Sequence, residues 1–221
     1  ASIAVPAWPN TWLRVNSAIS LATSTSEIRD SDADMFSAST GPHLGAKRDS
    51  AVYYVIDPEG EVRNRLGAFP GGESYETTDG ENWVGGGVVF GDFGYAAVSG
   101  SGFYYGDSDR FEIQYRSQSG DLLKVLKLDH ENLPVTQGDI DAYVADRMER
   151  ARPERRPIYR TMFENMPFPD VMPAFGDFVV DAGGNLWVGV YRKPGDDQPR
   201  WYVFDGDGAY LGIVETPERF R

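Results

Sequence analysis

Apolar residues along the chain occur in short runs separated by turn residues, a pattern that predicts many short strands. The clearest example is 175–217, where four apolar runs are joined by three turns. Two of these turns, beginning at Asp181 and Asp205, place Asp three residues before Gly. Asp bonds its own backbone in such a turn, and Gly adopts the left-handed conformation that closes it. We therefore expect two successive hairpins of one four-stranded antiparallel sheet.

The same turn pattern recurs earlier in the chain. Gly60 follows Asp57 and Gly120 follows Ser117 at the same spacing, each after an aromatic-rich apolar run. A serine hydroxyl makes a weaker version of the bond that Asp makes. Recurrence of one antiparallel unit indicates a repeat architecture, and four-stranded units are typical of propeller blades. An ordinary β-sandwich whose hairpins share this turn chemistry is the alternative.

The expected fold is all-β: a partial β-propeller-like array of about three four-stranded antiparallel sheets with one inserted helix. We expect a single domain over residues 1–221. Its first strands are predicted at 17–28, 51–56 and 62–69, and pairs of strands are predicted in the later units. The polar segment 30–48 is predicted as a loop, and the Gly-rich segment 70–87 is predicted as a connection. The boundaries that we expect for the units are about 11–70, 83–129 and 174–214, with a helical insertion at 134–160.

One segment has helical rather than strand periodicity. Thr136 and Asp139 resemble a capping box with Asp in place of Glu, and Pro153 is expected to end the helix. One face of this helix is apolar and comprises Ile140, Tyr143, Val144, Met148 and Ala151. We expect that face to pack on a neighbouring sheet.

Two stretches resemble a known group of proteins. The C-terminal run MPAFGDFVVDAGGNLWVGVYR…WYVFDGDGAYLGIVETP resembles the last blade of bacterial six-bladed β-propellers related to the NHL-repeat group. The preceding YRSQSGDLLKVLKLDHENLPVTQGDIDAYV is similar to the blade and helical insertion before it. The resemblance covers about residues 95–217, the C-terminal half of such a propeller. It implies a fold rather than an activity, because this fold hosts ligand binders, enzymes and scaffolds.

The blade count departs from that group. At about 40–45 residues per blade, six blades need more than the 221 residues of this chain. Three units leave sheet edges and apolar faces uncovered. The chain either pairs with itself or with another subunit, belongs to a longer protein or covers the open face with its own loops. Each option predicts an interaction surface, and other protein subunits are the expected partners.

Composition excludes several classes of function. A formal charge of −13 and a pI near 4.5 argue against nucleic-acid binding, which needs many Lys and Arg. The absence of cysteine excludes disulfides, thiolate nucleophiles and Cys-based metal sites. No apolar run is long enough to span a membrane, so we expect no transmembrane segment.

Catalytic and metal-binding motifs are weak. The two histidines are His43 and His130, and no G-x-S-x-G motif is present, so nothing favours nucleophilic catalysis. The aspartates of 30–34 match the start of an EF-hand loop, but Met35 and Gly41 stand where Gly and Glu are required. We therefore expect no cofactor. Propeller lactonases hold calcium with Glu, Asn and Asp from several blades, and the candidates for such a site are Asn82, Glu112, Asp177 and Asn185.

A group of arginines stands out against the acidic background. Six fall within fourteen residues of the helical insertion: Arg147, Arg150, Arg152, Arg155, Arg156 and Arg160. Arginine binds carboxylates and phosphates bidentately, so these residues are candidates for binding an acidic subunit or anionic lipid headgroups. The competing interpretation is that they pair with the protein's own acids. Five tryptophans are further candidates for stacking on a ligand, although tryptophans in strands are more often core: Trp8, Trp12, Trp83, Trp187 and Trp201.

These observations predict a non-enzymatic binding or scaffolding protein. We expect an extrinsic subunit that docks on a larger, membrane-bound complex in an extracytoplasmic, periplasmic location. The alternatives are a periplasmic hydrolase or lactonase with calcium in a propeller channel and a sensor domain for a small ligand.

Overall fold

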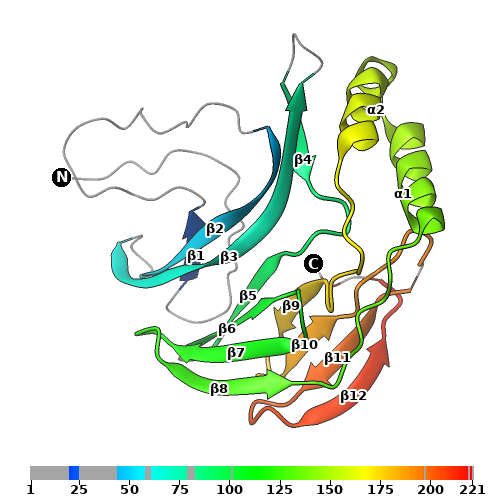
Figure 1. Ribbon diagram of the computed structural model, residues 1–221. Helices are drawn as coiled ribbons and strands as arrows, with labels where there is room; N and C mark the ends of the chain where they lie inside the picture. Colours follow the sequence, from blue (N-terminus) through cyan, green and yellow to red (C-terminus); the bar gives the residue numbers. More distant parts are fainter. Residues whose placement is uncertain are drawn as a thin grey trace, which may run out of the picture.

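The computed structural model describes residues 20–24, 44–57, 61–78, 83–100, 102–196, 198–218 and 220. Within them the chain forms three four-stranded antiparallel sheets and one helical insertion (Figure 1). The predicted all-β class is confirmed. The three sheets are compatible with a propeller-like arrangement.

The first sheet has the strand order β1-β2-β3-β4. Its strands are β1 (Ser20–Ser24), β2 (Gly45–Ile56), β3 (Val62–Thr78) and β4 (Trp83–Gly87). Three predictions for this region are wrong. Gly45–Arg48 is strand rather than loop, the glycines of 70–87 lie largely within β3 and β4 rather than in a connection, and β4 pairs with β3 instead of opening the second unit. The predicted loop at 30–43 lies outside the described residues.

The other two sheets are regular meanders. The middle sheet has the order β5-β6-β7-β8 and comprises β5 (Gly94–Ser99), β6 (Gly102–Asp107), β7 (Glu112–Ser117) and β8 (Leu122–Lys127). The third sheet has the order β9-β10-β11-β12 and comprises β9 (Asp177–Val180), β10 (Leu186–Gly189), β11 (Arg200–Phe204) and β12 (Tyr210–Glu215). In both, each strand pairs with its neighbours in the sequence, as the predicted hairpins require.

The recurring turn has one geometry wherever it is fully described. In the β11–β12 turn the Gly208 N–H donates to the Asp205 carbonyl over 2.9 Å, and Gly208 has φ +91°. The Asp205 side chain accepts from the Ala209 N–H at 2.8 Å. The turns after Ser117 and Asp181 repeat these bonds. The predicted role of Asp or Ser followed by a left-handed Gly is therefore confirmed.

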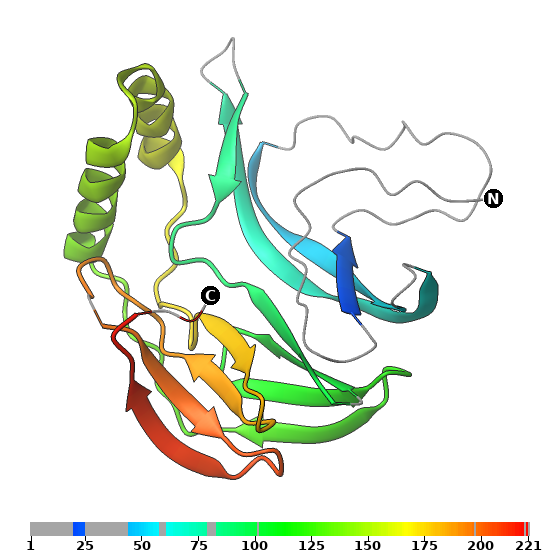
Figure 2. The ribbon, with the colours of Figure 1, turned by 180° about the vertical axis from the view of Figure 1, so that it is seen from behind.

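The three sheets stack with the middle sheet between the other two. Its face toward the third sheet buries Ile113 and Leu126 against Phe178, Leu186 and Phe204. The opposite face buries Phe103 and Tyr105 against Tyr53, Val55 and Leu66 of the first sheet. Figure 2 shows this stack from behind. Consecutive blades of a propeller pack in the same way, but the three sheets of the described residues do not close into a ring.

The helical insertion joins β8 to β9 and packs beside β4 (Figure 1). It comprises α1 (Gln137–Arg150), the 3₁₀ turn η1 (Pro153–Arg155) and α2 (Arg156–Asn165). The predicted capping box is present, because the Thr136 side chain accepts from the Asp139 N–H and the Asp139 carboxylate accepts from the Thr136 N–H. The predicted apolar face packs through Ile140, Tyr143 and Val144. The second helix was not predicted; a proline within its first turn starts it after the break at Pro153.

Candidate functional site: a pocket beside β4 and the edge of β12

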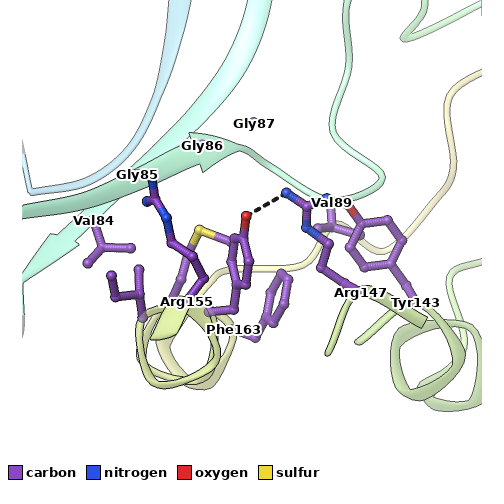
Figure 3. A pocket seen from close by; sticks show the side chains of 12 residues that line it. Val84, Gly85, Gly86, Gly87, Val89, Tyr143, Arg147, Arg155 and Phe163 are labelled. Atoms are coloured by element: carbon purple, nitrogen blue, oxygen red, sulfur yellow. Dashed lines mark hydrogen bonds between the residues drawn. The ribbon is translucent and has the colours of Figure 1, made fainter. Parts of the chain in front are cut away.

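A pocket of about 320 Å³ lies between the first sheet and the helical insertion (Figure 3). One wall is Val84–Gly87 of β4 with Val89 after it. The opposite wall is formed by side chains of α1, η1 and α2, among them Arg147, Arg155, Tyr159, Met162 and Phe163. Two of the six candidate arginines therefore line a cavity.

One glycine of β4, Gly86, leaves space between the strand and the helices. Gly86 faces α2, and a Cβ built on it would lie 3.7 Å from the Met162 Sδ, an ordinary contact distance. A longer side chain at Gly86 would occupy part of the space between sheet and helices, whereas a Cβ on Gly85 would meet Glu76 and Tyr75 of β3 instead. Gly86 thus keeps the pocket open, whereas the sequence pattern suggested only a connection.

Aromatic rings form much of the helical wall. The rings of Tyr159 and Phe163 are stacked, with centroids 6.1 Å apart and planes at 19°, and Tyr143 meets Phe163 edge-on at 6.0 Å. Phe163 and Met162 are buried, and Tyr143 and Tyr159 are half-buried. These rings give the helical side of the pocket a largely apolar backing.

Of the two pocket arginines, Arg147 is held by a neighbouring side chain and Arg155 by none among the described residues. Arg147 donates from Nη2 to the Tyr159 hydroxyl over 2.7 Å, and its guanidinium carbon lies 4.6 Å from the centre of the Tyr159 ring. The Arg155 side chain has no hydrogen bond or ion pair with any described residue. Figure 3 shows both side chains reaching from the helices toward β4. Neither guanidinium is neutralised by a carboxylate within the described part of the chain.

All six candidate arginines are exposed residues, and the remaining four lie outside the pocket. Arg150 pairs with Asp146 at 2.8 Å, and Arg156 donates to the Ala151 carbonyl over 3.3 Å. Arg152 and Arg160 make no ion pair with a described residue. Pairing with the protein's own acids therefore accounts for one of the six arginines among the described residues.

The carboxylate and amide candidates for calcium do not converge. Glu112 pairs with Lys127 at 2.9 Å, and Asn185 donates to Asp181 in the β9–β10 turn. Asp177 bonds the N–H of its own neighbour Phe178. No group of three His, Cys, Asp or Glu residues close enough to hold a metal ion occurs among the described residues. Asn82 lies outside them.

His130 and two of the tryptophans have structural contacts. His130 packs against the rings of Phe111 and Tyr202, and burial lowers the pKa of its imidazole. The Trp187 indole donates to Asp181 over 2.9 Å, and the Trp201 indole donates to Thr216 over 3.1 Å. Both indole rings contact Phe220. His43, Trp8 and Trp12 lie outside the described residues, as does the side chain of Trp83.

Apolar side chains gather on the outermost strands of the middle and third sheets. More than half of the exposed large apolar side chains in the described residues lie on β8 and β12: Leu122, Leu123, Val125, Tyr210, Leu211, Ile213 and Val214. The two strands are neighbours in space, because Lys124 Nζ donates to the Gly206 carbonyl in the turn before β12 over 3.0 Å. Sequence patterning placed these residues in strands but did not show that they stay uncovered.

Among the described residues, the backbone of β12 is unpaired along one edge. The strand is last in its sheet, so no described strand pairs with its outer side. Arg200 of β11 pairs with Glu215 of β12. The Arg200 carbonyl accepts from the Val190 N–H, so the backbone groups of Arg200 point toward β10 and away from Glu215. Because paired residues of an antiparallel ladder alternate between bonding each other and facing away, the backbone groups of Glu215 and Ile213 point outward.

Comparison with protein-family models and with curated proteins finds no match for this chain. The three sheets are compatible with a propeller-like arrangement, and the likeness to bacterial six-bladed propellers stays a prediction. No helix within the described ranges is long and apolar enough to cross a membrane.

Proposed function

We propose that the protein is a non-enzymatic binding subunit that docks on a larger protein assembly by adding β12 to a strand of a partner. The observation that carries this proposal is the combination on β12 of outward backbone groups with apolar side chains exposed on both faces. Tyr210, Leu211, Ile213 and Val214 are 38–60% exposed. Glu215 is the one charged residue of the strand.

This composition is unusual for an edge strand. Proteins that do not pair through an edge protect it with charges, proline or a covering loop. β8 follows that rule in part, since it carries Lys124 and Lys127, whereas β12 does not. An apolar, unprotected edge is what strand addition uses, because main-chain hydrogen bonds give affinity and alternate side chains give specificity.

The chemistry of this edge favours a protein chain over a lipid surface. The outward N–H and C=O groups of Ile213 and Glu215 need hydrogen-bond partners when water is removed, and acyl chains provide none. An extended peptide provides both donors and acceptors at the spacing of the strand. The exposed arginines of the insertion, Arg152 and Arg160, extend the proposal to acidic surfaces of the same assembly. An extracytoplasmic position beside a membrane is part of this proposal and is supported by the resemblance to bacterial propeller proteins.

The test is the native mass of the protein extracted from its source cells in mild detergent. The wild-type chain is expected in a complex well above its own 24.5 kDa. Ile213→Lys places a charge on the open edge and is expected to release the chain from that complex. Val171→Lys changes an equally exposed apolar residue outside the sheets and is the matched control.

Two results would contradict the proposal. One is a lone 24.5 kDa species for the wild-type chain. The other is a complex that survives Ile213→Lys as well as it survives Val171→Lys. The purified chain could also form a complex by itself that Ile213→Lys breaks. That result would show that the edge pairs with a second copy of the chain rather than with a different protein.

A further inference from the structure

The pocket beside β4 has a role that docking through β12 does not explain. We propose that it binds a small organic anion whose apolar body lies in the cavity between β4 and α2 and whose acidic group is held by Arg147 and Arg155. This inference is independent of the proposed docking function, because the pocket and β12 involve different elements.

The first argument is charge. The chain has 34 acidic and 21 basic residues, so a guanidinium has many carboxylates available for pairing. Yet Arg147 and Arg155 both line the pocket and make no ion pair with a described residue. Two uncompensated guanidinium groups on one cavity form a local positive field in an acidic protein, and they match the planar geometry of a carboxylate or phosphate.

The second argument is preorganisation. The Tyr159 hydroxyl and ring fix the Arg147 guanidinium through one hydrogen bond and one stacking contact. Holding the side chain in place before binding reduces the entropy lost when a ligand binds. The bond to Tyr159 uses Nη2 and leaves the other N–H groups of Arg147 available to an anion.

The third argument is shape. A volume of about 320 Å³ is at the lower end of the range for small-molecule sites, which suits a ligand with one or two rings. Val84, Val89, Ile158 and Met162 complete an apolar lining. Methionine adapts to irregular ligand shapes better than branched residues do.

The experiment titrates the purified full chain with 2-naphthoate and follows the backbone amide signals of Gly85, Gly86 and Gly87 by NMR. We expect saturable shifts at these glycines with a Kd in the micromolar to low-millimolar range, about −4 to −8 kcal/mol. The neutral analogue 2-naphthamide has the same rings without the charge. It is expected to bind about tenfold more weakly or less, because the charge-assisted bonds are lost.

Matched variants assign the site. Arg147→Gln and Arg155→Gln are each expected to weaken 2-naphthoate binding about tenfold. Arg152→Gln and Arg160→Gln remove equivalent exposed charges from the same insertion outside the pocket and are expected to change nothing. Gly86→Leu is expected to fill the cavity and abolish binding while the remaining amide spectrum shows a folded protein.

Several outcomes would overturn the proposal. They are the absence of saturable shifts at the three glycines up to about 10 mM ligand, equal binding of the amide and the acid, an equal effect of the pocket and control arginine variants, or unchanged binding in a folded Gly86→Leu protein. Loss of the cellular complex in Ile213→Lys bears on the docking proposal alone.

Discussion

The core between the middle and third sheets and the core beside β4 are built from different residues. The first consists of rings and branched side chains such as Phe175, Ile113 and Leu186, all at 0% exposure. The second is rich in methionine, with Met162, Met166 and Met172, and it leaves a cavity. The hairpins of the middle and third sheets bury their rings fully, whereas the inserted helices lie beside a strand whose Gly86 has no side chain to fill the gap.

Two glycines show the same contrast at single positions. A Cβ on Gly106, in the first core, would lie 2.8 Å from Phe178 Cζ and 3.0 Å from Phe175 Cζ. A Cβ on Gly86, in the second, has its nearest neighbour at 3.7 Å. One glycine is required by close packing and the other preserves space. This difference is why we place the proposed ligand site in the second region.

The largest expected effect is the loss of a ring from the dense core. Phe175→Ala should lower the free energy of unfolding by about 3–5 kcal/mol, because it removes apolar contacts and leaves a void. Phe163→Ala should cost clearly less, because that ring already borders the pocket. Urea unfolding of both variants measures the difference. Equal losses would contradict the contrast between the two cores.

The glycine pair sharpens the comparison. Gly106→Ala should destabilise the protein by about 1–3 kcal/mol, because the new methyl must displace packed rings. Gly86→Ala should leave the free energy of unfolding within about 0.5 kcal/mol of the wild type, because the methyl enters the pocket. Thermal unfolding of the two variants checks this prediction. A Gly86→Ala variant as unstable as Gly106→Ala would show that the pocket is too small for a ligand.

The turn aspartates Asp181 and Asp205 accept different numbers of hydrogen bonds. Asp181 accepts bonds from the N–H groups of Gly183 and Asn185 and from the side chains of Asn185 and Trp187, at 2.8–2.9 Å. Asp181→Ala should therefore cost about 1–3 kcal/mol. Asp205→Ala should cost less, because the Asp205 side chain accepts from two backbone N–H groups alone in an exposed turn. Chemical denaturation of both variants ranks them.

The pH dependence of the Asp181 contribution has a definite sign. Partial burial alone would raise the pKa of Asp181, but the hydrogen bonds from Trp187, Asn185 and Gly183 outweigh it and hold the pKa below its ordinary value. The stabilisation is therefore complete above the unfolded carboxyl pKa of about 3.9 and is lost as pH falls through the lower folded value. The stability difference between wild type and Asp181→Ala should shrink on acidification through this range. A difference that grows would be incompatible with this assignment.

The smallest expected effect concerns the cap of α1. Thr136→Ala removes the acceptor for the Asp139 N–H and should cost about 1 kcal/mol. The loss should appear mainly as faster amide exchange in the first turn of α1. An undiminished protection there would mean that tertiary contacts, including the Lys193–Asp139 ion pair at 3.3 Å, hold the helix start without the cap.

Much of the strand architecture could be predicted because its signals are local. The turns at Ser117, Asp181 and Asp205 fix hairpins through bonds within five residues, and the cap at Thr136 does the same for α1. Gly45–Arg48 could not be recognised as a strand, since its side chains alternate between half-buried and exposed without an apolar face. It is ordered by pairing with the distant Glu73–Glu76 of β3.

The candidate sites depended on contacts that no local pattern reveals. The pocket joins Gly86 to Met162 and Phe163, which are separated by more than seventy positions in the chain. Arginine content pointed to the right insertion but could not separate Arg147 and Arg155, which line the cavity, from Arg152 and Arg160, which do not. The open edge of β12 follows from its last place in the sheet, a property of topology rather than of composition.

The most direct test of strand addition is amide hydrogen exchange along β12 in the free chain and in the complex from its source cells. The account predicts that the outward amides of Ile213 and Glu215 exchange rapidly in the free chain and become strongly protected in the complex. The inward amide of Val214, bonded within the sheet, should already be protected in both. Equal, rapid exchange of Ile213 and Glu215 in both states would show that no partner strand pairs with β12, and the proposed function would be wrong.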